Sequence, residues 1–104
     1  MNDFIELKGA SGAAYRFRRW VEGTSHLPIA GNYVYVREAG EGFKVVLVGV
    51  TTDLSRSRED VVKAVPRKGG HLYTRLNVSR TTRQGEHDDL VAANNAALVS
   101  DVEG

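Results

Sequence analysis

The feature that most constrains this chain is an apolar run in its middle. Residues Val45–Val50 read VVLVGV and contain no polar side chain. A short, β-branched run of this kind predicts a strand that is covered on both faces. It falls far below the roughly 18 apolar residues that a membrane-spanning helix needs. Gly49 inside the run indicates that another part of the protein approaches its backbone closely.

Two hairpins are predicted, three of their strands from alternating patterns and the fourth from the apolar run, with turn residues between the strands of each pair. The first has strands near Phe4–Lys8 and Ala13–Trp20, and its alternation slips at Arg18–Trp20. The second has strands at Tyr33–Arg37 and Lys44–Val50, which a glycine-containing turn joins. The chain is therefore predicted to begin with two antiparallel strand pairs.

Helices and a further strand are predicted after the second hairpin. Asp53 is the predicted N-cap of a helix over Leu54–Val65, and His71–Val78 alternates as a strand. A last helix is expected to run from a cap within 79–82 to about Ala97. Its apolar stripe comprises Leu90, Val91, Asn94, Ala97 and Leu98. This order predicts an α+β fold, an antiparallel sheet with an additional N-terminal hairpin and two flanking helices.

Length and composition place this chain among single soluble domains. Its 104 residues suit one domain, which we expect to have its core at about 10–98 and a short acidic C-terminal tail. No basic-then-apolar leader opens the chain, so no signal peptide is expected. The absence of cysteine excludes disulfides and thiolate metal sites. We expect a cytoplasmic protein that does not bind membranes.

Charge is segregated along the sequence although the net charge is only +1. Residues 1–53 are balanced, residues 54–84 hold eight basic and two acidic residues, and residues 85–104 hold five acidic residues and no Lys or Arg. The basic block is a candidate nucleic-acid footprint. The alternative is a solvated helix and loop that the acidic tail neutralises. The candidate backbone-binding residues are Arg56, Arg58, Lys63, Arg67, Lys68 and Arg75.

Several motifs, in order and spacing, resemble the GIY-YIG nuclease domain. Gly31-Asn-Tyr33 matches the family's first strand, and 47–54 (LVGVTTDL) matches its second strand and the T-x-D-L entry into a helix. The stretch 83–95 (RQGEHDDLVAANN) resembles the family's closing helix, and 10–17 and 23–25 resemble a small bacterial branch. Together these motifs cover most of residues 10–98.

The resemblance implies phosphodiester cleavage with one divalent metal, which a carboxylate on the closing helix holds. It also implies two hairpin tyrosines and a helix arginine. The first tyrosine matches Tyr33. The other three positions carry different residues, namely Leu47 for the second tyrosine, Ser57 for the arginine and His87 for the carboxylate. A degenerate domain that binds nucleic acid without catalysis is therefore the first expectation, and we expect it to hold no cofactor or metal.

Two alternatives stay open at this point. In a rearranged active site, Arg58 and Glu86 would replace the missing groups beside Tyr33, and the protein would be a Mg²⁺- or Mn²⁺-dependent endonuclease. Otherwise the domain would bind a protein partner or form a homodimer without nucleic acid. We expect Ser57 to be a helix-surface residue, with a nucleophile as the alternative. We expect His87 to be a structural residue, with a metal ligand or a base as the alternative. The hairpin aromatics Tyr15, Phe17 and Trp20 are expected in the core, with base stacking as the alternative.

Overall fold

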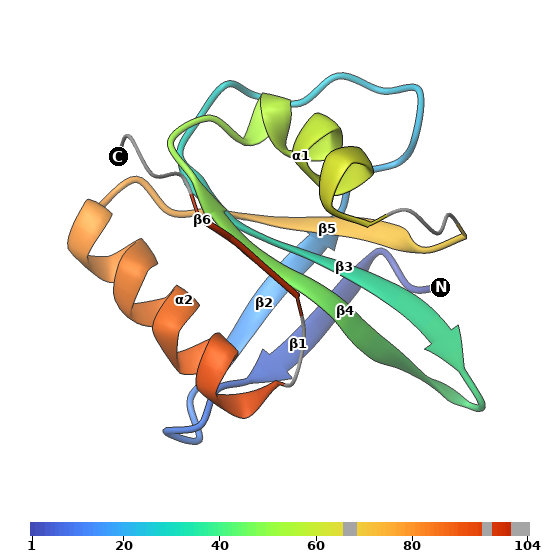
Figure 1. Ribbon diagram of the computed structural model, residues 1–104, viewed down its shortest axis with the longest axis horizontal. Coiled ribbons are helices and arrows are strands. Elements are labelled where there is room, and N and C mark those ends of the chain that lie inside the picture. The colour runs from blue at the N-terminus through green and yellow to red at the C-terminus, as the bar shows by residue number, and fades with distance from the viewer. Residues whose placement is uncertain (66–68, 95–96, 101–104) are drawn as a thin grey trace.

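The computed structural model describes residues 1–65, 69–94 and 97–100. One six-stranded sheet in the order β1-β2-β5-β3-β4-β6 organises them, and two helices flank it (Figure 1). Neither described helix is long and apolar enough to cross a membrane. The predicted α+β class is confirmed. In chain order the elements are β1 (Phe4–Lys8), β2 (Ala14–Arg19), β3 (Gly31–Ala39), β4 (Gly42–Thr51), the 3₁₀ turn η1 (Leu54–Arg56), α1 (Ser57–Ala64), β5 (His71–Leu76), α2 (Arg80–Ala93) and β6 (Ala97–Ser100).

Both predicted hairpins form. β1 pairs with β2, from Phe4 opposite Arg18 to Lys8 opposite Ala14. β3 pairs along its whole length with β4 and, on its other edge, with β5. The β3–β4 register shifts between Tyr35 and Val36, so that β4 carries one extra residue there. This bulge places the neighbours Val46 and Leu47 on the same buried side, which explains why the run in β4 is apolar without alternation.

The end of the last helix was predicted wrongly. α2 ends at Ala93, whereas Ala97 and Leu98 belong to β6, which runs parallel to β4. The outer edge of β4 has unpaired backbone groups, and pairing with β6 satisfies them. The helix over 54–65 begins as the 3₁₀ turn η1, and the predicted cap is confirmed because Asp53 Oδ1 accepts a hydrogen bond from the Ser55 amide at 3.0 Å.

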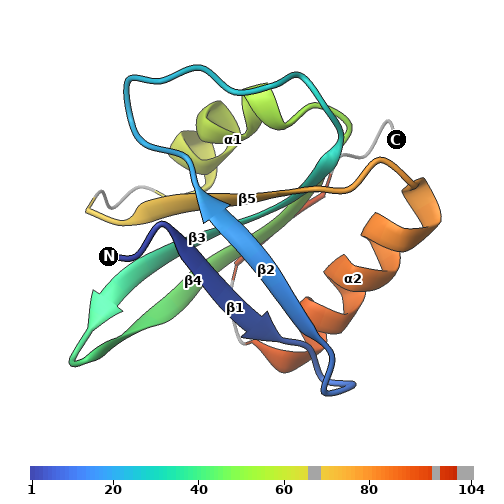
Figure 2. The same cartoon turned by 180° about the vertical axis from the view of Figure 1, so that it is seen from behind.

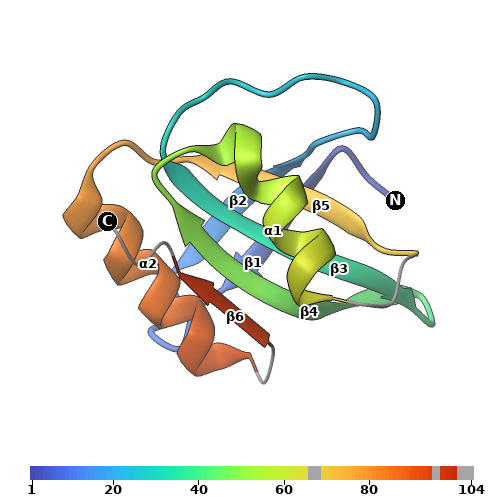
Figure 3. The ribbon, with the colours of Figure 1, turned by 45° about the horizontal axis from the view of Figure 1, so that its top comes forward.

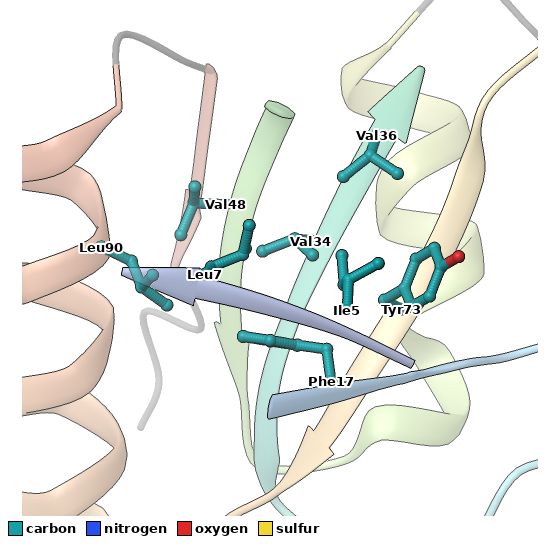
Figure 4. Close-up of a cluster of buried hydrophobic side chains, with 8 residues drawn as sticks. All are labelled: Ile5, Leu7, Phe17, Val34, Val36, Val48, Tyr73 and Leu90. Carbon is teal, nitrogen blue, oxygen red and sulfur yellow. The ribbon is translucent and has the colours of Figure 1, made fainter. Parts of the chain in front are cut away.

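Two hydrophobic cores lie on opposite faces of the sheet, one beneath each helix. Figure 3 shows α1 lying over one face, and Figure 4 shows the side chains packed on the other face near α2. The core under α2, called here the α2-side core, consists of Ile5, Leu7, Phe17, Val34, Val36, Val48, Tyr73 and Leu90. The α1-side core consists of Tyr33, Leu47, Leu54, Val61, Val65 and Leu72.

The close approach that Gly49 predicts is confirmed. Gly49 lies opposite Tyr33 in the β3–β4 register, and the fully buried ring of Tyr33 occupies the space where a side chain at 49 would stand. Any β-carbon there would overlap the aromatic ring. The glycine is therefore required by packing, since it leaves room for the tyrosine in the α1-side core.

We expect Gly49→Ala to lower the free energy of unfolding by about 1–3 kcal/mol, because the added methyl group overpacks a filled core. Urea denaturation measures this loss. Gly85→Ala is the matched control, because Gly85 lies within α2 with open space around it. That change should raise stability by roughly 0.5–1 kcal/mol. An unaltered midpoint for Gly49→Ala would contradict the packing role of Gly49.

A polar contact fixes the β1–β2 turn onto α2. The Asp89 carboxylate accepts hydrogen bonds from the Ser11 amide at 2.8 Å, the Ser11 hydroxyl at 2.6 Å and the Tyr15 hydroxyl at 2.7 Å. These bonds, the one from the Ser11 hydroxyl first, lower the pKa of Asp89, and the same carboxylate raises the pKa of Tyr15. The N-terminal hairpin is thus held at its turn as well as by its apolar side chains.

This contact predicts a specific acid dependence. Because the pKa of Asp89 is lower in the folded protein, its contribution to stability is complete above its ordinary pKa and is lost as the pH falls through the folded value. Asp89→Asn should therefore be less stable than wild type near neutral pH, and the difference should shrink in acid. Thermal unfolding of the wild type and the variant at a series of pH values measures the stability difference and its decrease in acid. A constant difference across the series would contradict the assignment.

Candidate functional site

Three of the four positions that the GIY-YIG resemblance marks as catalytic are buried on the α1 side of the sheet. The Tyr33 ring is fully buried, and its hydroxyl lies 3.5 Å from Asp60 Oδ2, a long hydrogen bond. Leu47 packs in the same core. Ser57 is also fully buried, and its hydroxyl donates to the Leu54 carbonyl at 2.7 Å. This serine completes a helix turn, and it lies inside the protein, not on the surface where the sequence placed it.

The fourth position, His87, lies on α2 and faces the other side of the sheet. Its side chain is 3% exposed. Burial lowers the pKa of His87, and the nearby Asp88 only partly opposes this effect. The imidazole is therefore neutral at neutral pH, as suits a histidine inside the fold. It offers no carboxylate in place of the metal-binding group that the family would have here.

Tyr33, Arg58 and Glu86, the rearranged catalytic set, are not brought together. Arg58 turns toward Trp20, donating to its carbonyl oxygen at 2.6 Å with the guanidinium 4.4 Å from the ring centroid. Partial burial there lowers the pKa of Arg58. Glu86 pairs instead with Arg75 at 2.8 Å and accepts a hydrogen bond from Asn77 at 2.9 Å.

The sheet itself separates Glu86, on the α2 side, from Tyr33, on the α1 side. Asn32 and Tyr33 are neighbours on β3 and so point to opposite faces. The Asn32 amide reaches α2 by donating to the Arg83 carbonyl at 2.9 Å, whereas Tyr33 packs beneath α1. Within the described ranges, no group of three or more histidine or carboxylate side chains is placed to hold a metal ion. The carboxylate of the rearranged set, Glu86, is held by Arg75 and Asn77, and the family's own carboxylate position carries His87.

The predicted basic footprint is dispersed in the fold. Arg56 and Lys63 are exposed on η1 and α1. Arg58 is engaged with Trp20 and Arg75 with Glu86, and the positions 67 and 68, like the end of the acidic tail, lie outside the described residues. Of the candidate binding residues that the structure describes, two are therefore exposed, and elsewhere in the basic block Arg80 is exposed and Arg83 is buried.

A different basic surface lies on β2 and β5, beneath the long loop that joins β2 to β3. Figure 2 shows this loop arching away from the sheet beyond the end of β2. A concavity of about 720 Å³ lies between the loop and the strands. It is called here the arginine groove, and the residues that characterise it are Phe4, Arg16, Arg18, Arg19, Trp20, His26, Thr74, Arg75 and Leu76.

Positive charge dominates the arginine groove. Four arginines line it, and none of its described lining residues is acidic. Arg16 and Arg18 alternate with the buried Phe17, so they point away from the α2-side core, and both are exposed. Neither forms an ion pair with another described residue, although Glu6 lies opposite Arg16 just outside the groove. The Arg16 guanidinium lies 3.9 Å from the centroid of the Phe4 ring.

Side-chain hydrogen bonds fix the wall of the groove. The Trp20 indole donates to the Thr24 carbonyl at 2.9 Å, and the Thr24 hydroxyl donates to the Val21 carbonyl at 2.6 Å. His26 Nε2 lies 2.7 Å from the Thr74 hydroxyl, which ties the loop to β5. The groove is therefore largely formed before any ligand arrives.

The sequence contained only a weak signal for this groove. Residues 1–53 have balanced charge, which concealed the arginines at 16, 18 and 19. Their alternation with Tyr15 and Phe17 indicates a basic strand face opposite an aromatic one, but only the fold shows that no helix covers that face. Of the aromatics, Phe17 is buried as predicted, whereas Tyr15 and Trp20 are only partly buried.

Comparison with known proteins leaves the resemblance to GIY-YIG domains as a prediction. No family model matches this chain, and neither the curated proteins nor the solved structures contain a match.

Proposed function

We propose that this protein is a non-catalytic, GIY-YIG-like domain that binds the backbone of nucleic acid through the arginine groove. The observation that carries the proposal is a concavity lined by four arginines, of which Arg75 is paired with Glu86, and, among its described lining residues, by no acid. Guanidinium groups donate two parallel hydrogen bonds to a phosphate, and they retain their charge at every physiological pH. Such a surface binds phosphates without reading sequence.

Loss of catalysis is the second part of the proposal. The family's catalytic positions carry Leu47, Ser57 and His87, and all three side chains are buried in the interior of the fold. The pairing of β3 with β4 and the helical turn after Asp53 support the ancestry that the motifs predict. A domain with this history keeps its scaffold while its function becomes binding. We place that function in the cytoplasm, in keeping with the expectation from the sequence.

Labelled oligonucleotides test both parts together. Fluorescence anisotropy of the wild-type protein should rise on titration at low salt. The logarithm of the binding constant should then fall linearly with the logarithm of salt concentration, with a slope of about −0.7 to −0.9 per neutralised phosphate. On denaturing gels the oligonucleotides should stay intact with Mg²⁺ or Mn²⁺. Metal-dependent cleavage that Glu86→Ala abolishes would contradict the proposal, and so would the absence of any binding at low salt.

A further inference from the structure

We infer that the arginine groove selects unpaired nucleotides over duplex, an inference that rests on the proposed function and specifies its ligand. The groove combines its charge with exposed apolar side chains. Phe4 is 43% exposed, Leu76 is 53% exposed and Leu27 is 56% exposed, and all three line it. A duplex presents phosphates and sugars on its outside and keeps the faces of its bases stacked. Only an unpaired base offers an aromatic face to such side chains.

The shape of the groove favours the same ligand. Proteins read a duplex by inserting a helix or a two-stranded ribbon into one of its grooves. The arginine groove is concave and has no projecting helix or ribbon to insert. The loop over residues 20–27 forms a wall above the strands and leaves a hollow of about 720 Å³. That volume lies in the range of pockets that enclose a small molecule, which for a nucleic acid means a base with its sugar and phosphate.

Aromatic and cationic groups are interleaved within the groove. Arg18 lies opposite Phe4 in the β1–β2 register, while Arg16 packs over the same ring. Trp20 stands at the other end, with the Arg58 guanidinium over its ring. Arginine close to aromatic rings is the arrangement that binds single strands, in which the rings contact bases and the guanidinium groups contact phosphates.

A second hollow extends this surface. It has a volume of about 470 Å³, and it shares Arg19 and Trp20 with the arginine groove. Its remaining walls include Tyr35, Arg58 and Leu72 from the α1 side of the sheet and one acidic residue, Glu22. Trp20 lines both hollows, so an unpaired strand that lies across this residue would contact both.

The test compares unstructured oligothymidylate and oligouridylate with a duplex of equal length, by anisotropy at one fixed low salt concentration. We expect single strands to bind at least about tenfold more tightly than duplex. Phe4→Ala should weaken single-strand binding roughly 5- to 150-fold by removing a stacking surface. It should leave duplex binding unchanged. Val78→Ala is the matched control, because that exposed apolar residue lies outside both hollows and should change neither.

The outcomes separate this inference from the function on which it rests. Equal affinity for single strands and duplex, with no effect of Phe4→Ala, would overturn the inference and leave backbone binding intact. No binding of any oligonucleotide would overturn both. Competition by polyglutamate as strong as that by oligothymidylate would also overturn both, because it would identify an acidic polypeptide as the ligand.

Discussion

Replacing Arg16 and Arg18 together by alanine should weaken oligonucleotide binding at least about 100-fold. Each guanidinium is exposed on the same face of β2 and lines the arginine groove. A hydrogen bond to a charged group contributes about 1.5–3 kcal/mol, and a tenfold change in affinity corresponds to about 1.4 kcal/mol. The loss of two phosphate contacts should also make the plot of log binding constant against log salt concentration shallower, by the contribution of two phosphates.

The control for this experiment is the double variant Arg56→Ala with Lys63→Ala. It removes the same charge from exposed positions on η1 and α1, outside the arginine groove. We expect it to weaken binding only a few fold through the general field of the protein. Both double variants should unfold at the same urea concentration as wild type, because surface substitutions usually change stability by less than about 0.5 kcal/mol. A larger effect for the Arg56 and Lys63 pair would move the interface to the basic block of residues 54–84.

Phe17→Ala should lower the free energy of unfolding by about 3–5 kcal/mol, a large part of the roughly 5–15 kcal/mol that a domain possesses. Phe17 is fully buried in the α2-side core, where Figure 4 shows it beside Ile5 and Leu7 from β1. β2 is joined to β5 at only two register pairs, Arg18 with Thr74 and Arg19 with Tyr73. Side-chain packing therefore adds to the Asp89 hydrogen bonds at the turn in holding the N-terminal hairpin to the rest of the fold.

Phe4→Ala is the matched control for the stability experiment. Phe4 lies on the same hairpin but points to the open face and is exposed. Its replacement should cost little stability while it weakens binding, whereas Phe17→Ala should cost stability first. Urea denaturation followed by fluorescence measures both variants. A loss below about 1 kcal/mol for Phe17→Ala would mean that the cavity closes by relaxation and that the hairpin is not an integral part of the core.

Much of the fold could be predicted because its signals are local. Alternation located the first hairpin and β3, the apolar run located β4, and Asp53 marked the start of the helical segment. β6 was missed because Ala97 and Leu98 continue the helical spacing of α2. Their place is decided by the open edge of β4, which is a tertiary effect that no local pattern contains.

The candidate site depends on which face of the sheet each helix covers. The sequence indicated correctly that His87 is a structural residue, as its burial shows. It gave no sign that α2 would pack on the face opposite Tyr33, and so it could not exclude a site with Glu86. The arginines of β2 were overlooked for a related reason, because a strand face becomes a groove only where a loop folds back to form a wall beside it, and no local pattern fixes the path of that loop.

Mapping the bound oligonucleotide by NMR tests the central claim most directly. Amide resonances of the full chain are followed during titration with unstructured oligothymidylate. The largest shifts should cluster at Arg16–Trp20, along the loop to His26 and at Thr74–Leu76, with smaller shifts on α1 where Arg58 lines the second hollow and little change across α2. Shifts centred on Arg56–Ala64, or none at saturating oligonucleotide, would contradict the arginine groove as the nucleic-acid interface.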